Sequence, residues 1–213
     1  AAPHVSRGRG RAVAAPLLRA GAVATLAAGV VGTLRQARES RAVRAGHRPG
    51  TGPDGDPVPR RAPGTVAARL GDWVPPPPRT ALGRAAAGLW AAPLTAVGVA
   101  VALAGGRTPR HDPERACWVA TGVGGPSRAA LGAVGAAANT IGRVVLVRGA
   151  IPGPALLDHE AVHVRQAERL GPLLPVAYAW LGARYGYADN PLERAARAGA
   201  RRAATLRRDR GAG

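Results

Sequence analysis

The chain has 213 residues, which is enough for one ordinary domain or for a small domain with membrane and linker segments. Phe, Met and Lys are absent and seven residues are aromatic, so Ala, Leu and Val must fill a sparse core that covers only part of the chain. The single Cys117 excludes an internal disulfide and any metal site built from several cysteines.

The charge is strongly positive, because all thirty basic residues are Arg and there are only twelve acidic ones, giving a net charge of +18. Such a charge is typical of proteins that bind nucleic acid or an anionic membrane surface. The Arg residues are dispersed, however, and no nucleic-acid-binding motif accompanies them, so we expect no nucleic-acid partner. Arg without Lys, beside abundant Ala, Gly and Pro, is also typical of a GC-rich bacterial genome.

Residues 1–84 form a basic, low-complexity N-terminal region. Within it, the apolar stretch 12–33 follows three Arg residues and resembles a signal-anchor segment, and both membrane insertion and a surface stretch stay open for it. Residues 34–84 are rich in Gly and Pro, including the run Pro75 to Pro78, which favours an extended chain. This part is therefore predicted to be a linker without a core.

Residues 85–106 are twenty-two uncharged residues between Arg84 and Arg107. About twenty such residues cross the hydrocarbon layer as a helix, so we predict a transmembrane helix, with a buried soluble helix as the alternative. Arg residues lie on both sides and give no orientation. We therefore predict that the protein lies in the bacterial inner membrane, and the side of the membrane on which its functional site lies stays open.

Residues 112–213 have the pattern of a folded α+β domain. Two β-prone runs bounded by glycine, 116–122 and 140–149, predict strands joined by a helix or loop. Three helices are predicted to follow. They run from residue 154 to Gly171, over 173–184, and from Pro191 onward with Asn190 as the cap.

The first of these helices contains the sequence HEAVH, residues 159–163. Residues four apart point within about 40° of each other and lie about 6 Å apart along the axis, so His159 and His163 can bind one metal ion. Glu160 lies beside them, where a carboxylate can take a proton from a water molecule. The alternative is an exposed helix face that carries these residues by chance.

A zinc hydrolase normally takes three protein ligands, so a third donor is needed. Glu193, in the first turn of the last helix, is the favoured candidate. Glu168 is the rival, but it lies about 140° around the helix from His163 and should point away. A capping role is the alternative for Glu193, because Asn190 and Glu193 have the spacing of a capping box.

The stretches GAAANTIGRVVLVRG, HEAVHVRQAERLGPLLPVAY and DNPLER together resemble the gluzincin zinc metallopeptidases, in particular the compact minigluzincins and a group of bacterial, often membrane-associated proteins. The resemblance covers residues 133–198. It implies a small zincin-like domain with a short β-sheet and an active-site helix, preceded here by one or two membrane helices and the Pro/Gly-rich linker.

The same resemblance implies roles for the matching positions. His159, His163 and Glu193 would be ligands of Zn²⁺, and Glu160 would be the general base. Residues 141–148 would form the strand along which an extended substrate pairs. Gluzincins commonly carry an acidic residue shortly after the ligand Glu to orient a histidine, whereas this chain has Arg194 and Arg197, so that role is unfilled.

A donor for the substrate carbonyl is also required. Tyr185, Tyr187 and Arg165 are the candidates, and Tyr187 is the one predicted. Gln166, on the same helix face as His163, is predicted either to contact the metal site or substrate or to be a solvated polar residue.

The leading interpretation is a membrane-associated zinc metallopeptidase acting on a peptide or protein substrate. The alternative is a non-catalytic metal-binding or partner-binding module at the membrane. The oligomeric state stays open.

Overall fold

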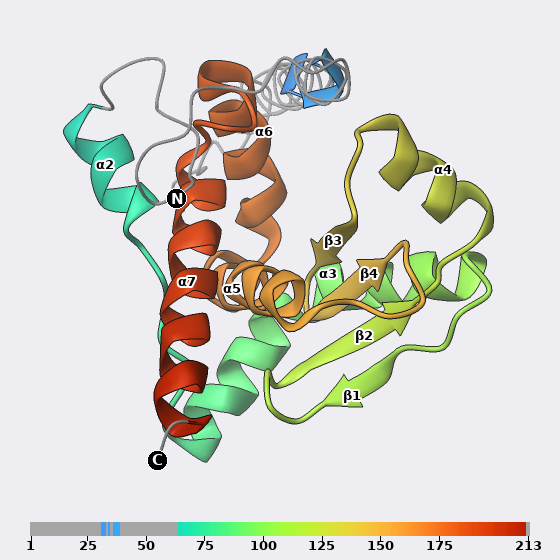
Figure 1. The fold of residues 1–213 in the computed structure, drawn as a ribbon, viewed down its shortest axis with the longest axis horizontal. Helices are drawn as coiled ribbons and strands as arrows, with labels where there is room; N and C mark the ends of the chain where they lie inside the picture. Colours follow the sequence, from blue (N-terminus) through green and yellow to red (C-terminus); the bar gives the residue numbers. More distant parts are fainter. Residues whose placement is uncertain (1–30, 33, 35, 39–63, 212–213) are drawn as a thin grey trace, which may run out of the picture.

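The computed structural model describes residues 31–32, 34, 36–38 and 64–211. Most of the expected apolar helix 12–33, and residues 39–63 of the expected linker, lie outside these ranges. The described chain is α+β, with a four-stranded sheet and several helices (Figure 1). The α+β fold class is therefore confirmed.

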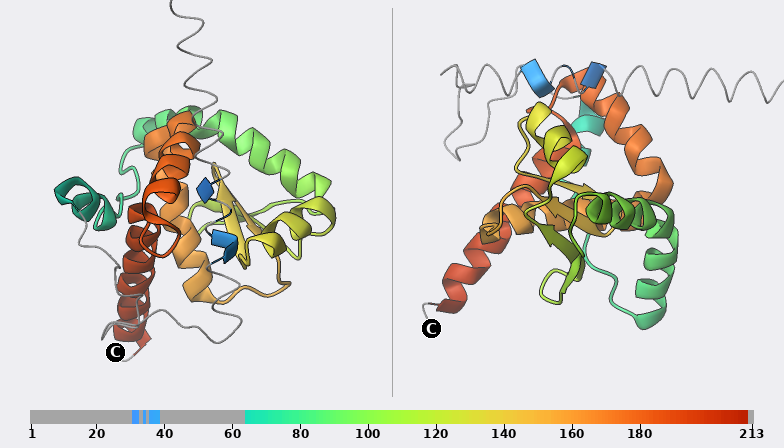
Figure 2. Two further views of the ribbon diagram at one scale, coloured as in Figure 1. Left: turned by 90° about the horizontal axis from the view of Figure 1, so that it is seen from above. Right: turned by 90° about the vertical axis from the view of Figure 1, so that its right-hand side faces the viewer.

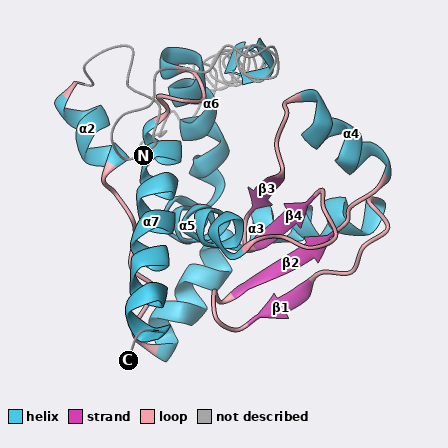
Figure 3. Cartoon of the chain, in the orientation of Figure 1, coloured by secondary structure: helices cyan, strands magenta, loops and turns pink. Residues whose placement is uncertain are grey.

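The sheet has the strand order β1-β2-β4-β3. Strands β2 and β4 are parallel, and the two outer pairs are antiparallel. Helix α4 (Gly125–Ala133) lies between β2 and β3 in the chain, and the four strands gather on one side of the molecule (Figure 3). Their bounds are Arg110–Asp112 (β1), Cys117–Thr121 (β2), Ala138–Ile141 (β3) and Val144–Val147 (β4).

Strand β4 is buried on both faces, which explains its unbroken apolar sequence VVLV. Val144 and Leu146 pack in a cluster with Ala102 of the helix that precedes the sheet. Val145 and Val147 face the other way and pack with Val164 of the histidine-bearing helix. The alternation of a strand thus joins two small cores, one on each face.

The expected single strand over 140–149 is wrong, because β3 and β4 form a hairpin that turns at Gly142. Gly142 has φ +64°, and a Cβ there would lie 2.3 Å from the backbone N of Thr95. The turn therefore needs glycine both for its conformation and for its close approach to a neighbouring helix. The expectation that 141–148 is open to a substrate is also wrong, because β4 pairs with β2 and β3. The edge strand on that side is β3.

Helix α3 (Ala81–Ala104) has a mean hydropathy of 1.8 over eighteen residues and is long and apolar enough to cross a membrane. Its small residues Ala91, Gly98 and Ala102 are buried. A Cβ on Gly98 would lie 2.5 Å from Ile141 O, so this face packs tightly on the sheet. Both further views show α3 along one side of the molecule (Figure 2). The exposed large apolar residues of α3 are Leu82, Leu89, Trp90, Val97 and Leu103.

The expected linker contributes to packing in its described part. Helix α2 (Thr65–Gly71) buries Ala67, and Pro75 of the proline run is fully buried. A Cβ on Gly199 of the last helix would meet the Val74 side chain at 3.2 Å, so the extended stretch lies directly against that helix. The prediction that nothing in residues 34–84 belongs to a core is therefore wrong for residues 67–75.

The three predicted C-terminal helices are confirmed. They are α5 (Pro154–Leu170), α6 (Leu174–Tyr185) and α7 (Pro191–Gly211), with a short 3₁₀ turn η1 (Gly171–Leu173) after α5. Helix α5 lies between the sheet and α7 (Figure 1). Asp158 near its start pairs with Arg207 late in α7, whereas Gln166 farther along bonds to Leu192 at the start of α7. The two helices are therefore antiparallel.

Candidate metal centre

The candidate centre forms where the first turn of α7 meets the middle of α5. Asn190 Oδ1 accepts a hydrogen bond of 3.0 Å from the backbone N–H of Leu192, and Pro191 occupies the first helical position. This cap fixes where α7 begins and so places Glu193 in its first turn. Glu193 then faces the two histidines of α5.

His159, His163 and Glu193 converge on one point. His159 Nε2 lies 3.3 Å from Glu193 Oε2, and His163 Nε2 lies 3.3 Å from Glu193 Oε1. The imidazole centroids are 5.0 Å apart at an interplanar angle of 76°. The ligand atoms of all three residues lie within 4.8 Å of one another, so this cluster could hold a metal ion. Glu193 is thus brought to the histidines, as expected.

The carboxylate of Glu193 is almost fully enclosed. The Tyr178 hydroxyl of α6 donates a 2.6 Å hydrogen bond to its Oε1. Its Oε2 is buried and makes no hydrogen bond. A buried carboxylate that has one imidazole nitrogen 3.3 Å from each of its oxygens is suited to a cation. Tyr178 was not among the sequence candidates, because the spacing within α6 gives no sign of which tyrosine faces α7.

Two further contacts hold the other polar groups of the centre. Thr140 of β3 donates a 2.7 Å hydrogen bond to Glu160 Oε2. Gln166 Oε1 lies 2.9 Å from His163 Nδ1, so Gln166 is a buried neighbour of the site rather than a solvated residue. Helix α5 is therefore linked to the edge strand on one side and to α7 on the other.

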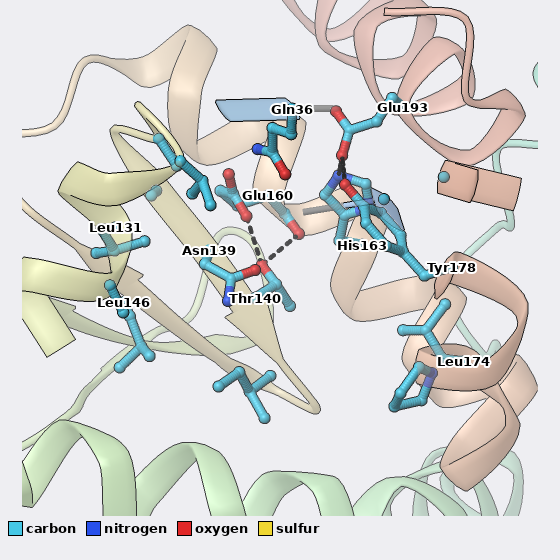
Figure 4. Close-up of a pocket in the computed structure, with 18 of the residues that line it drawn as sticks. Gln36, Leu131, Asn139, Thr140, Leu146, Glu160, His163, Leu174, Tyr178 and Glu193 are labelled. Atoms are coloured by element: carbon cyan, nitrogen blue, oxygen red, sulfur yellow. Dashed lines mark hydrogen bonds and ion pairs between the residues drawn. The ribbon is translucent and has the colours of Figure 1, made fainter. Parts of the chain in front are cut away.

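The cluster lies in the wall of a cavity of about 650 Å³. Figure 4 shows His163, Tyr178 and Glu193 on one side of it and Leu131 and Leu146 on the other, with Glu160 and Thr140 between them. Among the described residues that line it there is no Arg. The charged groups are confined to the metal cluster and Glu160, and most of the remaining wall is apolar. Gln36, from the described part of the N-terminal region, also lines the cavity.

The remaining candidates fall inside or outside this cavity. Tyr187 lines it, whereas Tyr185 and Arg165 do not. Glu168 forms an ion pair of 3.1 Å with Arg143, which confirms that it points away from the histidines. Of the other histidines, His111 lies against Trp118, and His4 and His47 lie outside the described residues.

The protonation of the cluster is strongly coupled. Burial alone would lower the pKa of His163, but the charge of Glu193 and the contact with it, together with the charge of Glu160 and the contact with Gln166, raise it from 6.5 to about 9. Burial alone would raise the pKa of Glu193, yet the charges of His163 and His159 and the contacts with both rings together hold it well below 4.5. Burial and the nearby Glu193 charge both raise the pKa of Tyr187, so its phenol keeps its proton at neutral pH. Without a metal, the cluster is thus a buried ion pair.

We expect the metal-free protein to be less stable in alkali, because this ion pair is lost when His163 loses its proton. A raised His163 pKa contributes stability that is complete below about pH 6.5 and is lost as the pH rises through about 9. The lowered Glu193 pKa contributes stability above pH 4.5 that is lost as the pH falls. Urea denaturation at pH 6.5 and pH 9.5 should give a loss of about 3 kcal/mol in the free energy of unfolding. Equal or greater stability at pH 9.5 would contradict this pairing.

Comparison with protein-family models, with curated proteins and with solved structures finds no match to this chain. Support for a function therefore comes from the geometry of the centre itself.

Proposed function

We propose that this protein is a membrane-associated zinc metallopeptidase of the gluzincin type, built on a zincin-like domain. His159, His163 and Glu193 would bind Zn²⁺, and Glu160 would be the general base. The observation that carries this proposal is the arrival of Glu193, from a separate helix, within 3.3 Å of both histidine Nε2 atoms. Zinc hydrolases use such a set of two imidazoles and one carboxylate, with one position left open.

The donor set suits zinc in its chemistry and in its burial. Two imidazole nitrogens favour a transition metal over Ca²⁺ or Mg²⁺, which prefer oxygen ligands. The Glu193 Oε2 atom, buried without a hydrogen bond, gains a partner when a cation binds. Bound zinc would polarise a peptide carbonyl and lower the pKa of the attacking water.

Glu160 lines the same cavity as His159, His163 and Glu193, which supports a role in proton transfer. Its Oε2 accepts the hydrogen bond from Thr140, which leaves Oε1 as the oxygen without a hydrogen-bond partner in the described chain. We assign to Glu160 the removal of a proton from the attacking water and its later delivery to the leaving amine. This role favours the peptidase over the alternative of a non-catalytic metal-binding module, which has no need of a carboxylate at this point.

Tyr187 remains our candidate for the donor to the substrate carbonyl oxygen. It lines the cavity, and its raised pKa keeps the hydroxyl protonated at neutral pH. Tyr178 is less suited to this task, because its proton is already donated to Glu193 at 2.6 Å. A hydroxyl that is committed to a metal ligand orients that ligand rather than the substrate.

The substrate is proposed to be a peptide with a large, uncharged side chain next to the scissile bond. Leu131 and Leu146 line the cavity opposite Glu160, and no Arg or Lys side chain lines its described wall to accept an acidic group. The outer face of α3, with Leu89 and Trp90 exposed, would attach the protein to a membrane. The partners would thus be a peptide or protein substrate and the lipid bilayer.

Incubation of the zinc-loaded full chain with a mixed peptide library, followed by mass spectrometry, tests this function. We expect cleavage beside residues such as Leu, Ile and Phe, and loss of cleavage when a chelator removes the metal. Cleavage beside charged residues only would contradict the apolar subsite. No products from a fully zinc-loaded protein would favour the non-catalytic module instead.

A further inference from the structure

The amide of Gln166 is fully buried between α5 and the start of α7, and both of its polar atoms are bonded. Its Oε1 lies 2.9 Å from His163 Nδ1, and its Nε2 donates to the backbone oxygen of Leu192 at 3.2 Å. Burial of a primary amide is unfavourable unless its groups are hydrogen-bonded. The position of Gln166, three residues after His163, puts it on the same face of α5.

These two contacts together determine where the proton on His163 lies. The carbonyl oxygen of Leu192 can only accept a hydrogen bond, so the group of Gln166 that faces it must be the NH₂. The amide oxygen then faces the imidazole and, as an acceptor, requires that Nδ1 carry a proton. The lone pair of a neutral His163 is therefore on Nε2, the atom 3.3 Å from Glu193.

The second contact reaches the other metal-binding helix. Leu192 immediately precedes Glu193 and is itself 1% exposed. One amide thus connects the ring of His163 to the backbone that carries the acidic ligand. A shift of α7 relative to α5 would break the Gln166 to Leu192 bond at the same time as it separated Glu193 from the histidines.

We propose that Gln166 is the positioning residue of the metal centre, and that it fixes both the tautomer of His163 and the register of α7 on α5. This role rests on the proposed function only in that the centre binds a metal. Gln166 does not touch the ion. Gln166 orients the histidine ring, a role that an acidic residue after the ligand Glu has in gluzincins. In this chain Arg194 and Arg197 follow Glu193 instead.

Two substitutions at Gln166 test its hydrogen bonds to His163 and Leu192. Gln166→Leu removes both at similar size, and Gln166→Glu keeps an acceptor for His163 while it replaces the donor that faces Leu192. Glu168→Gln is the matched control, because Glu168 lies on the same helix and pairs with Arg143. Zinc affinity is measured for each by competition with a chromogenic chelator. We expect Gln166→Leu to weaken zinc binding by about 10–100-fold and the control to leave it unchanged. Unchanged affinity in a folded Gln166→Leu protein would overturn the proposal.

A measurement on the unaltered chain covers the case in which Gln166→Leu does not fold. In ¹⁵N-histidine-labelled, zinc-loaded protein, Nδ1 of His163 should keep its proton and be protected from exchange, while Nε2 binds zinc. Zinc on Nδ1, or a freely exchanging Nδ1–H, would refute the positioning role. If zinc binds as expected but no peptide is cleaved, the peptidase proposal fails while the role of Gln166 stands.

Discussion

Replacement of Glu160 by Gln should reduce peptide hydrolysis by about 10²–10⁴-fold while zinc binding is retained. The amide cannot accept the proton that the attacking water must lose. It can still accept the hydrogen bond from Thr140 Oγ1, so the side chain should keep its position. The change therefore removes one proton acceptor and leaves the three proposed metal ligands untouched.

Hydrolysis and metal content have to be measured on the same preparation. kcat and KM for a cleaved library peptide report the chemical step, and elemental analysis of the dialysed protein reports the zinc. Glu168→Gln supplies the same chemical change on the same helix, at a site paired with Arg143 and away from the histidines. Its activity should match the wild type. A Glu160→Gln protein with the same kcat as the control would show that another group acts as the base.

The candidate centre was predictable in part, because its two histidines are local in sequence and its glutamate follows a readable helix start. The spacing of His159 and His163 places them on one helix face whatever the rest of the fold, since an α-helix returns to the same side after four residues. The start of α7 was also readable, because Asn190 and Pro191 are a strong cap and first-turn pair. These two local features were enough to predict that Glu193, and not Glu168, faces the histidines.

The features that could not be predicted depend on contacts between distant segments. Nothing in the run TIGRVVLVRG reveals that Gly142 turns the chain, because that turn is fitted to Thr95 in another helix. Tyr178 and Thr140 likewise acquire their roles only when α6 and β3 are placed beside the centre. The burial of Pro75 was missed for the opposite reason: a proline run is usually solvated, but the neighbouring Val74 lies against Gly199 of α7 and this part of the run is packed.

Helix α3 has the composition of a membrane span and also packs against the sheet, whereas the sequence offered these as alternatives. Its length and hydropathy predict a membrane span, whereas Ala91, Gly98 and Ala102 pack against the sheet. Small residues on one face permit this close approach, while several large apolar residues elsewhere on the helix are exposed. The cavity beside the candidate metal centre is lined by α3 residues, including Val97, which is itself half exposed. A membrane in contact with α3 would therefore lie close to the proposed substrate site.

Replacement of Glu193 by Gln should abolish stable metal binding, with an affinity loss greater than about 10²-fold, because even the loss of a residue that only orients a ligand costs 10–100-fold. The neutral amide is a poor ligand for zinc, and it would sit beside two imidazoles without the charge that holds them. In the metal-free protein, the pKa of His163 should fall from about 9, because Glu193 contributes most to raising it. The alkaline loss of stability should then be smaller than in the wild type.

This substitution also separates the two roles that the sequence allowed for Glu193. Gln serves as well as Glu at the third position of a capping box, so a capping role predicts normal zinc binding and unchanged helix stability in Glu193→Gln. A ligand role predicts a folded protein that has lost its metal. The observed cap already favours the second outcome, because Asn190 Oδ1 accepts from Leu192 N while both carboxylate oxygens of Glu193 face the histidines. Asn190→Ala provides the complementary test. Loss of the cap of α7 should lower the free energy of unfolding by about 1 kcal/mol, while the carboxylate of Glu193 stays available as a ligand.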